Sequence, residues 1–178
     1  MVALTRERLE TEQMILERMR PDHAEEIFAL LRDPLVARTL FASGLPQTDA
    51  EMADNLANKL EHWERYGFGL WLLRDRHTGA VVGRGGLQHT FVGGCDEVEV
   101  GWAITPARWG QGLATELARA SVQVAFDDLG LGEIVAFTLP TNVASRRVME
   151  KSGFTFERKI DHAGLPHVLY RRARDPSA

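Results

Sequence analysis

A glycine-bearing segment at the expected start of a helix, "RWGQGLATE" at residues 108–116, is the first place where this sequence could do chemistry. Gly110 and Gly112 remove side chains from the loop, so an anion could approach its backbone amides closely. A helix start also carries unpaired N–H groups and a partial positive charge. The segment therefore predicts a phosphate-binding loop, with an ordinary glycine turn as the alternative.

Two common phosphate-binding signatures do not fit this loop. A kinase-type P-loop needs Lys-Ser or Lys-Thr after its last glycine, and no glycine in the chain is followed by either pair. A dinucleotide fingerprint needs a third glycine where Thr115 stands, inside a βαβ unit, whereas antiparallel strands are expected before this loop. The "GRGG" at residues 83–86 lies inside a strand pattern and is not a phosphate loop. A mononucleotide or dinucleotide ligand is therefore disfavoured.

Two further segments stand around the loop in a fixed order. "EVGW" at residues 99–102 precedes it on an expected strand, and "NVASRRVMEKSGF" at residues 142–154 follows it on an expected helix. Together with "WGQGLATE" at residues 109–116, they resemble the GNAT superfamily of acetyl-CoA-dependent N-acyltransferases. More narrowly, they resemble its RimJ/RimL-like branch, the ribosomal-protein N-acetyltransferases. Glu17 is a departure, because that branch usually has a basic residue at this place in its opening strand.

The resemblance implies how acetyl-CoA, the cosubstrate, would be held. A V-shaped gap is expected between the strand ending at Ile104 and the strand at residues 133–139. The pantetheine arm would enter the gap and bond to backbone groups like an added strand, and the loop amides would take the pyrophosphate. Asn142 could cap its helix, hold the pantetheine, or do both. The expected cofactor-binding residues are Trp102, Ala103, Ile104, Trp109, Gly110, Gln111, Gly112, Leu113, Ala114, Thr115 and Asn142.

Two residues are candidates for catalysis. Transfer requires a neutral amine, and a base within reach of one water would help to deprotonate it. Glu99 is the candidate base; the alternative is that Glu97 and Glu99, on one strand face, are solvated or pair with Arg84. By resemblance, Ser145 donates a hydrogen bond or proton to the departing thiolate, and Tyr170 is the alternative acid. The backbone N–H of Ile104 could polarise the thioester carbonyl.

The resemblance predicts an N-acetyltransferase that moves an acetyl group from acetyl-CoA to a primary amine by direct attack in a ternary complex. The acceptor stays open: a protein N-terminus, an antibiotic amine, a polyamine or a small amino compound. A non-catalytic acyl-CoA-binding regulatory module is the alternative. It would keep the loop but would need neither Glu99 nor Ser145.

Periodicity predicts the elements that position these residues. Asp22 is the expected N-cap of a first helix, and Thr48 is the cap of a second helix that ends at Gly67. The segment between them, residues 32–47, is expected to be mostly loop. The implied fold is α+β, a GNAT-like α/β/α sandwich with a mixed, mostly antiparallel central sheet of about seven strands and four helices. Strands are expected at residues 14–19, 68–75, 80–91, 97–104, 133–139, 154–160 and 167–173, and helices at 21–33, 48–67, 112–130 and 142–154.

The bulk composition excludes several classes of protein. The net charge of −4 disfavours binding to nucleic acid by bulk electrostatics, and the single cysteine, Cys95, rules out an internal disulfide. No apolar run approaches the roughly 18 residues of a membrane span, and residues 1–13 lack the apolar core of a signal peptide. The six histidines show no metal-ligand spacing. We therefore expect one cytoplasmic domain over residues 1–178, without metal, membrane or nucleic acid; a homodimer stays open.

Overall fold

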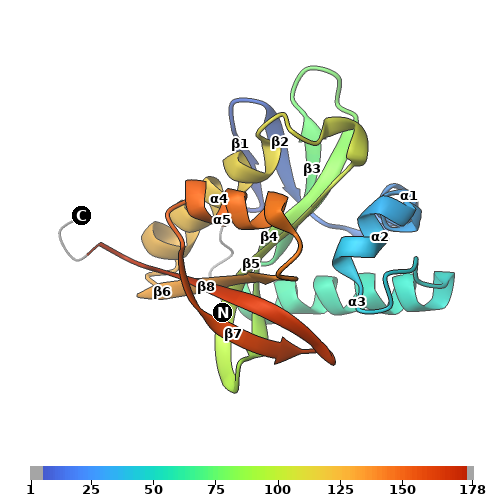
Figure 1. The fold of residues 1–178 in the computed structure, drawn as a ribbon. Helices are drawn as coiled ribbons and strands as arrows, with labels where there is room; N and C mark the ends of the chain where they lie inside the picture. Colours follow the sequence, from blue (N-terminus) through green and yellow to red (C-terminus); the bar gives the residue numbers. More distant parts are fainter. Residues whose placement is uncertain (1–5, 176–178) are drawn as a thin grey trace.

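A single mixed sheet forms the centre of the computed structural model, which describes residues 6–175 (Figure 1). Within this range the sheet has eight strands in the order β1-β2-β3-β4-β5-β6-β8-β7. All neighbouring strands pair antiparallel except β5 and β6, which run parallel. The strands are β1 (Arg8–Glu10), β2 (Met14–Arg18), β3 (Leu70–Asp75), β4 (Val81–Val92), β5 (Cys95–Ile104), β6 (Glu133–Thr138), β7 (Thr155–His162) and β8 (Leu165–Ala173).

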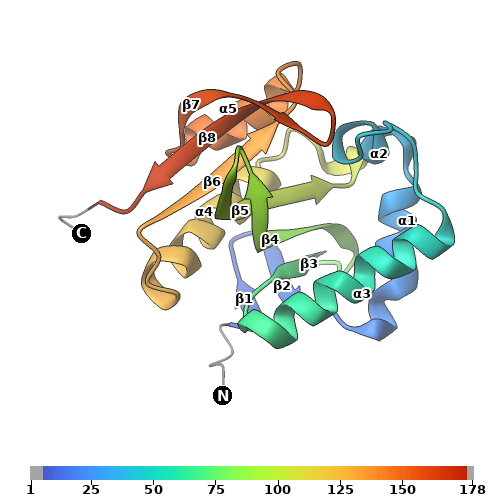
Figure 2. The same cartoon turned by 90° about the horizontal axis from the view of Figure 1, so that it is seen from below.

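Helices cover both faces of the sheet. Figure 2 shows α1, α2 and α3 grouped on one side and α4 on the other. A π-helical segment, Val124–Asp128, prolongs α4, and 3-10 turns precede α1 and α4. The α-helices are α1 (Ala24–Arg32), α2 (Pro34–Leu40), α3 (Asp49–Tyr66), α4 (Leu113–Gln123) and α5 (Val143–Lys151).

The side chains of β5 alternate between these two helical layers. Val100 and Ile104 belong to the core that also contains Leu113 of α4, whereas Ala103 packs against Val36 of α2. Since successive side chains of a strand point to opposite faces, the odd-numbered residues of β5 face α1–α3. This alternation places Glu99 on the α1–α3 side and the start of α4 on the other.

The sheet opens between β5 and β6. These strands share a single paired position, Glu99 with Val135, and β5 then continues to Ile104 without pairing to β6. β6 is held on its other edge by β8 along its whole length, from Glu133 to Thr138. The V-shaped gap expected between these two strands is therefore confirmed.

Glycines in β4 allow α4 and the neighbouring strand β5 to approach closely. A Cβ on Gly85 would lie 2.4 Å from a methyl carbon of Leu117 in α4, and a Cβ on Gly83 would lie 2.4 Å from the Ala103 carbonyl oxygen. Only glycine fits at such distances. The "GRGG" segment is thus part of a strand, as expected, and its glycines serve packing.

The main correction concerns residues 32–47, which were expected to be mostly loop. Pro34 begins α2 there, and the Asp33 carboxylate caps the helix by accepting a hydrogen bond from the Leu35 amide at 2.8 Å. Proline fits the first helical position because the amide that it lacks would be unpaired there anyway. The prediction treated Pro34 as a helix breaker and missed that the preceding aspartate makes it a helix start.

Two smaller corrections lie near the N-terminus. Asp22 does not cap α1, because a 3-10 turn (Pro21–His23) comes first and His23 holds the N-cap position. The short strand β1 was not predicted. The count is thus eight strands and five α-helices in residues 6–175, against about seven and four expected. The prediction that residues 1–13 are not a signal peptide falls partly on residues 1–5, which lie outside the described residues.

The predicted caps of α3 and α5 are confirmed. Thr48 and Glu51 form the reciprocal capping box of α3, with the Thr48 amide donating to Glu51 at 2.7 Å, and Gly67 ends the helix at φ +75°. Asn142 caps α5 by accepting from the Ser145 amide at 3.2 Å. No helix within residues 6–175 is long and apolar enough to span a membrane.

Candidate acyl-transfer site

A cleft of about 740 Å³ runs through the gap between β5 and β6 and is lined from both faces of the sheet. Every residue expected to bind the cofactor or to catalyse lies along it, except Gln111. The cleft also reaches helices α2 and α3, which the sequence did not connect with the site. The expected residues on its walls are Glu99, Trp102, Ala103, Ile104, Trp109, Gly110, Gly112, Leu113, Ala114, Thr115, Asn142 and Ser145.

The loop before α4 has the backbone that its glycines predict. Gly110 and Gly112 adopt φ values of +75° and +84°, a left-handed region that other residues enter only with strain. A Cβ at either position would meet no atom within 4 Å, so the space above the loop is open. Within residues 6–175, no side chain caps the first turn of α4, whose N-cap is Gly112. Its amides and partial positive charge therefore face the cleft, as an anion site requires.

An ion pair and a side-chain hydrogen bond hold this loop in place. Arg108 pairs with Asp75 of β3 at 2.6 Å and also donates to the side chain of Gln111 at 2.6 Å. Backbone N–H bonds from Thr78 and the Arg108 guanidinium hold the pKa of Asp75 well below its usual range, so this carboxylate stays charged. The Gln111 side chain thus fixes the loop, and Gln111 does not belong to the cleft wall.

Backbone register decides which groups of β5 face the gap. Residues of an antiparallel pair alternate between bonding to the partner strand and pointing to the other edge. The Thr105 amide donates to the Val82 carbonyl at 2.9 Å, which fixes this alternation. Trp102 and Ile104 therefore direct their backbone groups away from β4, toward the gap, while Ala103 directs its groups toward β4.

One of these backbone groups, the Ile104 carbonyl, is already hydrogen-bonded to Trp109. Its indole N–H donates to the Ile104 carbonyl at 2.7 Å, although almost half of the residue is exposed. This bond ties the phosphate loop to the end of β5. It leaves the N–H of Ile104 and the backbone groups of Trp102 as those that register directs into the gap.

Glu99 lies where the gap closes, in a buried polar chain. The residue is 9% exposed, and its carboxylate accepts a hydrogen bond from the side chain of Gln88 on β4. Gln88 in turn accepts from the Lys59 ammonium of α3 at 2.5 Å. Burial raises the pKa of Glu99, and the Gln88 bond and the Lys59 charge offset part of that rise. A carboxylate whose pKa is raised by burial and that lines a cleft is a candidate proton acceptor.

Arg84 is a second buried charge on the same face of the sheet. It is 4% exposed, lines the cleft, and donates to the side-chain carbonyl of Asn55 on α3 at 2.9 Å. Burial lowers the pKa of Arg84 to about 10. The sequence offered one signal for this residue, a lone charge between glycines in a strand pattern, and the prediction used it only as a partner for acidic residues.

The pairing alternative for the acidic residues of β5 is wrong. Glu97 pairs with Arg171 of β8 at 2.7 Å and Glu99 with Gln88, so neither contacts Arg84. Arg171 also bonds Glu133 and Glu157. Glu97 is thus part of an ion-pair network that joins β5, β6, β7 and β8, away from the cleft walls.

The two candidate acids lie in different places. Ser145 is half-buried in the first turn of α5 and lines the cleft. Tyr170 is 1% exposed and lies off the cleft, where its hydroxyl accepts from Arg146 and donates to Glu150, each at 3.2 Å. Tyr170 therefore links α5 to β8, and Ser145 is the acid candidate at the cleft.

Three rings stand at the cleft wall formed by β6 and the β7–β8 hairpin. Phe137 contacts His162 and His167 edge-on, with ring centroids 4.8 and 5.7 Å apart. Burial, and then the neighbouring His167, lowers the pKa of His162. The lowered pKa favours a neutral His162 ring at this wall of the cleft.

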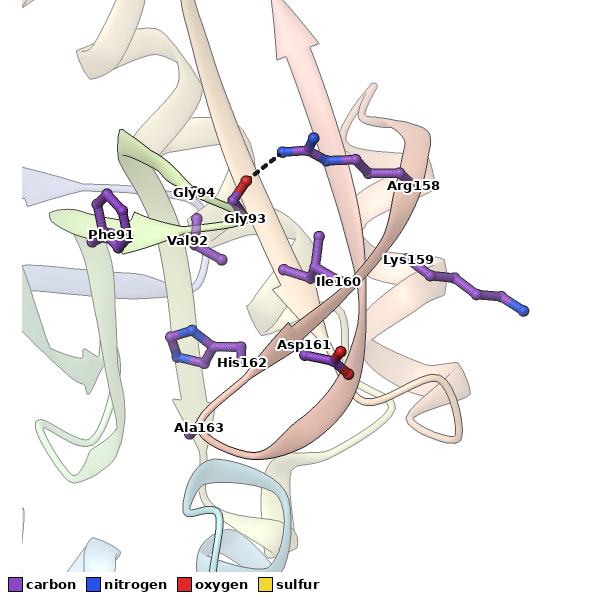
Figure 3. Close-up of a pocket in the computed structure, with 10 residues that line it drawn as sticks. All are labelled: Phe91, Val92, Gly93, Gly94, Arg158, Lys159, Ile160, Asp161, His162 and Ala163. Atoms are coloured by element: carbon purple, nitrogen blue, oxygen red, sulfur yellow. Dashed lines mark hydrogen bonds between the residues drawn. The ribbon is translucent and has the colours of Figure 1, made fainter.

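A second hollow, of about 520 Å³, lies between the β4–β5 turn and the β7–β8 hairpin (Figure 3). Arg158 closes one end by donating to the Gly93 carbonyl at 3.0 Å, and Lys159 points outward. None of the residues expected to bind or catalyse lines this hollow. Among residues 6–175 there is also no group of three or more His, Cys, Asp or Glu arranged to hold a metal ion.

Comparison with known families agrees with the geometry. A model of the acetyltransferase (GNAT) domain matches residues 13–155. YkkB, an uncharacterized protein of Bacillus subtilis, is 30% identical over 93% of this chain and 95% of its own length. The FsC-acetyl coenzyme A-N(2)-transacetylase of Aspergillus fumigatus is 33% identical over 83% of this chain, which spans 64% of that longer protein.

Solved structures show the same fold. A Bordetella pertussis protein described as a GNAT-family acetyltransferase superposes with a TM-score of 0.83 at 26% identity, over 94% of this chain and all of that one. RimL, an L7/L12 alpha-N-protein acetyltransferase solved with coenzyme A, superposes with a TM-score of 0.77 at 15% identity, over 94% of this chain and 98% of its own. At 15% identity the RimL match shows the fold alone, so the findings establish the domain family and not the RimJ/RimL-like branch.

Proposed function

The chain belongs to the GNAT acetyltransferase family and is an acetyl-CoA-dependent acyltransferase, and we propose that it acetylates a primary amine by direct attack in a ternary complex. One observation carries the proposal. The cleft joins an open phosphate-type loop on the α4 side of the sheet to a buried carboxylate on the α1–α3 side. Donor and acceptor can thus enter from opposite faces and meet in the gap.

The residues of the α4 side fit acetyl-CoA. The amides of Gly112 to Thr115 are placed to receive a pyrophosphate, and the exposed Arg147 and Lys151 of α5 line the same cleft. The backbone groups of Trp102 and Ile104 that point into the gap can bond the amide groups of a pantetheine arm. When bound, acetyl-CoA supplies an acetyl group activated as a thioester.

Groups of the protein then accept the proton of the amine and stabilise the developing negative charge. The amine nitrogen forms a bond to the acetyl carbon as the carbon–sulfur bond breaks. Glu99 takes the proton that the amine loses, directly or through one water. The Ile104 N–H is positioned to donate to the carbonyl oxygen, and the Ser145 hydroxyl to the departing sulfur. The products are an acetylated amine and CoA.

The acceptor is not fixed by the family. The matched proteins include an FsC-acetyl coenzyme A-N(2)-transacetylase and an alpha-N-protein acetyltransferase, which are named for different acceptors. The proposal therefore names a primary amine, and the charges of the α1–α3 side of the cleft decide its class.

Release of the CoA thiol tests this function. The purified protein would be mixed with acetyl-CoA and a panel of amines, with mass spectrometry of the products. Acetylated amine formed together with free thiol is the expected result. The non-catalytic regulatory module predicts tight acetyl-CoA binding without turnover of any amine, and that outcome would overturn the proposal.

A further inference from the structure

The α1–α3 side of the cleft contains a guanidinium that the protein does not neutralise. Arg84 is 4% exposed and, within the described residues, has one side-chain hydrogen bond, to the neutral amide of Asn55, although a guanidinium offers five N–H donors. Among residues 6–175 no carboxylate lies within 4 Å of it. Burying an unpaired charge is unfavourable, so such a site is expected to receive an anion from elsewhere.

Several half-buried arginines of the described residues receive carboxylates, whereas the half-buried Arg146 and Arg172 donate to uncharged oxygens. Arg74 pairs with Glu17 at 2.5 Å and with Glu26 at 2.7 Å. Arg108 pairs with Asp75 at 2.6 Å, and the three carboxylates around Arg171 include Glu97 at 2.7 Å, in the network described above. Arg84 is more buried than any of these and is the one that lines the acceptor side of the cleft. Arg84 therefore differs from the other arginines of the described residues in being buried at the cleft without a carboxylate.

The local charge balance points the same way. Three charged residues of α3, β4 and β5 face this part of the cleft: Lys59, Arg84 and Glu99. Lys59 donates to Gln88 and has no carboxylate within 4 Å in the described part of the chain. The two cations exceed the single carboxylate, and the excess grows when Glu99 accepts a proton.

We propose that the acceptor is an amino-carboxylate, a primary amine that also carries a carboxylate, which Arg84 and Lys59 bind while Glu99 receives the proton of the amine. The inference rests on the proposed function and deepens it by naming the substrate class. The planar fork of a guanidinium matches a carboxylate with two parallel hydrogen bonds. An amino-carboxylate brings the anion that this side of the cleft lacks.

The same charges disfavour two other acceptor classes. A polyamine would add positive charge beside Lys59 and Arg84, which is repulsive at short range in a partly buried site. A peptide N-terminus with no carboxylate near its amine would leave Arg84 buried and unpaired. Both classes are therefore expected to be poor substrates.

The first arm of the test compares the common L-amino acids with their carboxamides, together with spermidine and a neutral N-terminal peptide. Amidation lowers the pKa of the α-amine and by itself supplies more of the neutral nucleophile. At least one amino acid should nevertheless show a kcat/KM about tenfold or more above that of its carboxamide, because the bound carboxylate is lost on amidation. Equal or better use of all carboxamides, of spermidine or of the peptide would overturn the inference.

The second arm changes the cations. Arg84→Gln should raise KM for the amino acid about tenfold or more while KM for the carboxamide changes little, and Arg84→Lys should restore part of the loss. Arg38→Gln is the matched control, since Arg38 is exposed on α2 beside the cleft but does not line it. Equal loss for acid and carboxamide would show that Arg84 only supports the fold and would contradict the inference.

Titration of the amino acids into the CoA-saturated protein keeps the two proposals apart. Carboxylate-dependent binding without turnover of any amine would overturn the proposed function and leave the inference standing. Turnover that ignores the carboxylate would overturn the inference and leave the function standing. Binding of acetyl-CoA to Arg84→Gln, unchanged from the natural chain, shows that the variant is folded.

Discussion

The titration of Glu99 follows from where the carboxylate lies. Burial raises its pKa, and the hydrogen bond from Gln88 and the charge of Lys59 limit that rise. At low pH the group is protonated and cannot accept another proton. At a pH above the raised pKa it is a carboxylate and can act as a base. The activity should therefore fall as the pH falls through the raised pKa of Glu99.

Glu99→Gln tests this assignment. The amide has nearly the shape of the carboxylate but cannot take a proton, so kcat should fall about 100-fold or more at neutral pH. The acid-side decline in kcat/KM that belongs to Glu99 should disappear, leaving only the titration of the amine itself. A pH profile of kcat/KM for both proteins provides the measurement. An unchanged profile in the variant would show that Glu99 is not the base.

Ser145 is the second side chain with a proposed catalytic role. The residue lines the cleft in the first turn of α5, and its amide donates to the Asn142 side chain at 3.2 Å. Ser145→Ala removes a hydrogen bond to a developing thiolate, so kcat should fall about tenfold while acetyl-CoA binding persists. The control is Ser43→Ala, in the exposed turn after α2. Wild-type kcat in Ser145→Ala would rule out a role for this hydroxyl.

At the scale of elements, α2 joins the acceptor wall to the rest of the fold. Val36 packs beneath Ala103 of β5, and Leu40 and Thr39 line the cleft. The helix has seven residues and depends on its cap, because so short a helix is marginal by itself. The position of the acceptor wall therefore depends on Asp33.

Asp33→Ala should destabilise the protein by about 1 kcal/mol, since it removes the hydrogen bond to the Leu35 amide. Urea unfolding with the midpoint and slope fitted separately measures the change. Asp54→Ala, at an exposed position inside α3, is the matched carboxylate control and should have a smaller effect. A stability equal to that of the natural chain would contradict the capping role of Asp33.

Elements with long periodic patterns could be predicted from the sequence, and short ones could not. The Thr48–Glu51 box and the Asn142 cap stand next to the helices that they start, so local sequence was enough to find them. β1 has three residues, and α2 begins with a proline that is ambiguous without its tertiary neighbours. The capping role of Asp22 was wrong because the 3-10 turn ends only at His23.

The site residues also fall into those that local sequence could predict and those that it could not. Glu99, Ser145 and the glycine loop stand in ordered motifs, so the sequence could bring them together. Lys59 and Arg84 could not be found in this way, because their roles depend on α3 packing over β4. Gln88 faces Glu99 only through the register of β4 with β5. Such cross-element contacts have no local sequence signature.

At the scale of the whole molecule, the gap in the sheet is what makes transfer feasible. Because β5 and β6 pair at a single position, a cleft can cross from the α4 layer to the α1–α3 layer. In the proposed mechanism, the loop anchors one end of the donor, and the buried charges select the acceptor at the other. The proposed function depends first on the binding of acetyl-CoA to the loop at the start of α4.

The most direct measurement is isothermal titration of acetyl-CoA into the natural chain, Gly112→Trp and Gly94→Trp. Both glycines have positive φ, +84° and +87°, and open space where a side chain would stand, so the two variants carry similar backbone strain. Gly94 lies in the β4–β5 turn, outside the cleft. We predict binding to the natural chain and to Gly94→Trp and its loss in Gly112→Trp, because the indole fills the pyrophosphate position. Undiminished binding to Gly112→Trp, or none to the natural chain, would show that the loop does not hold acetyl-CoA.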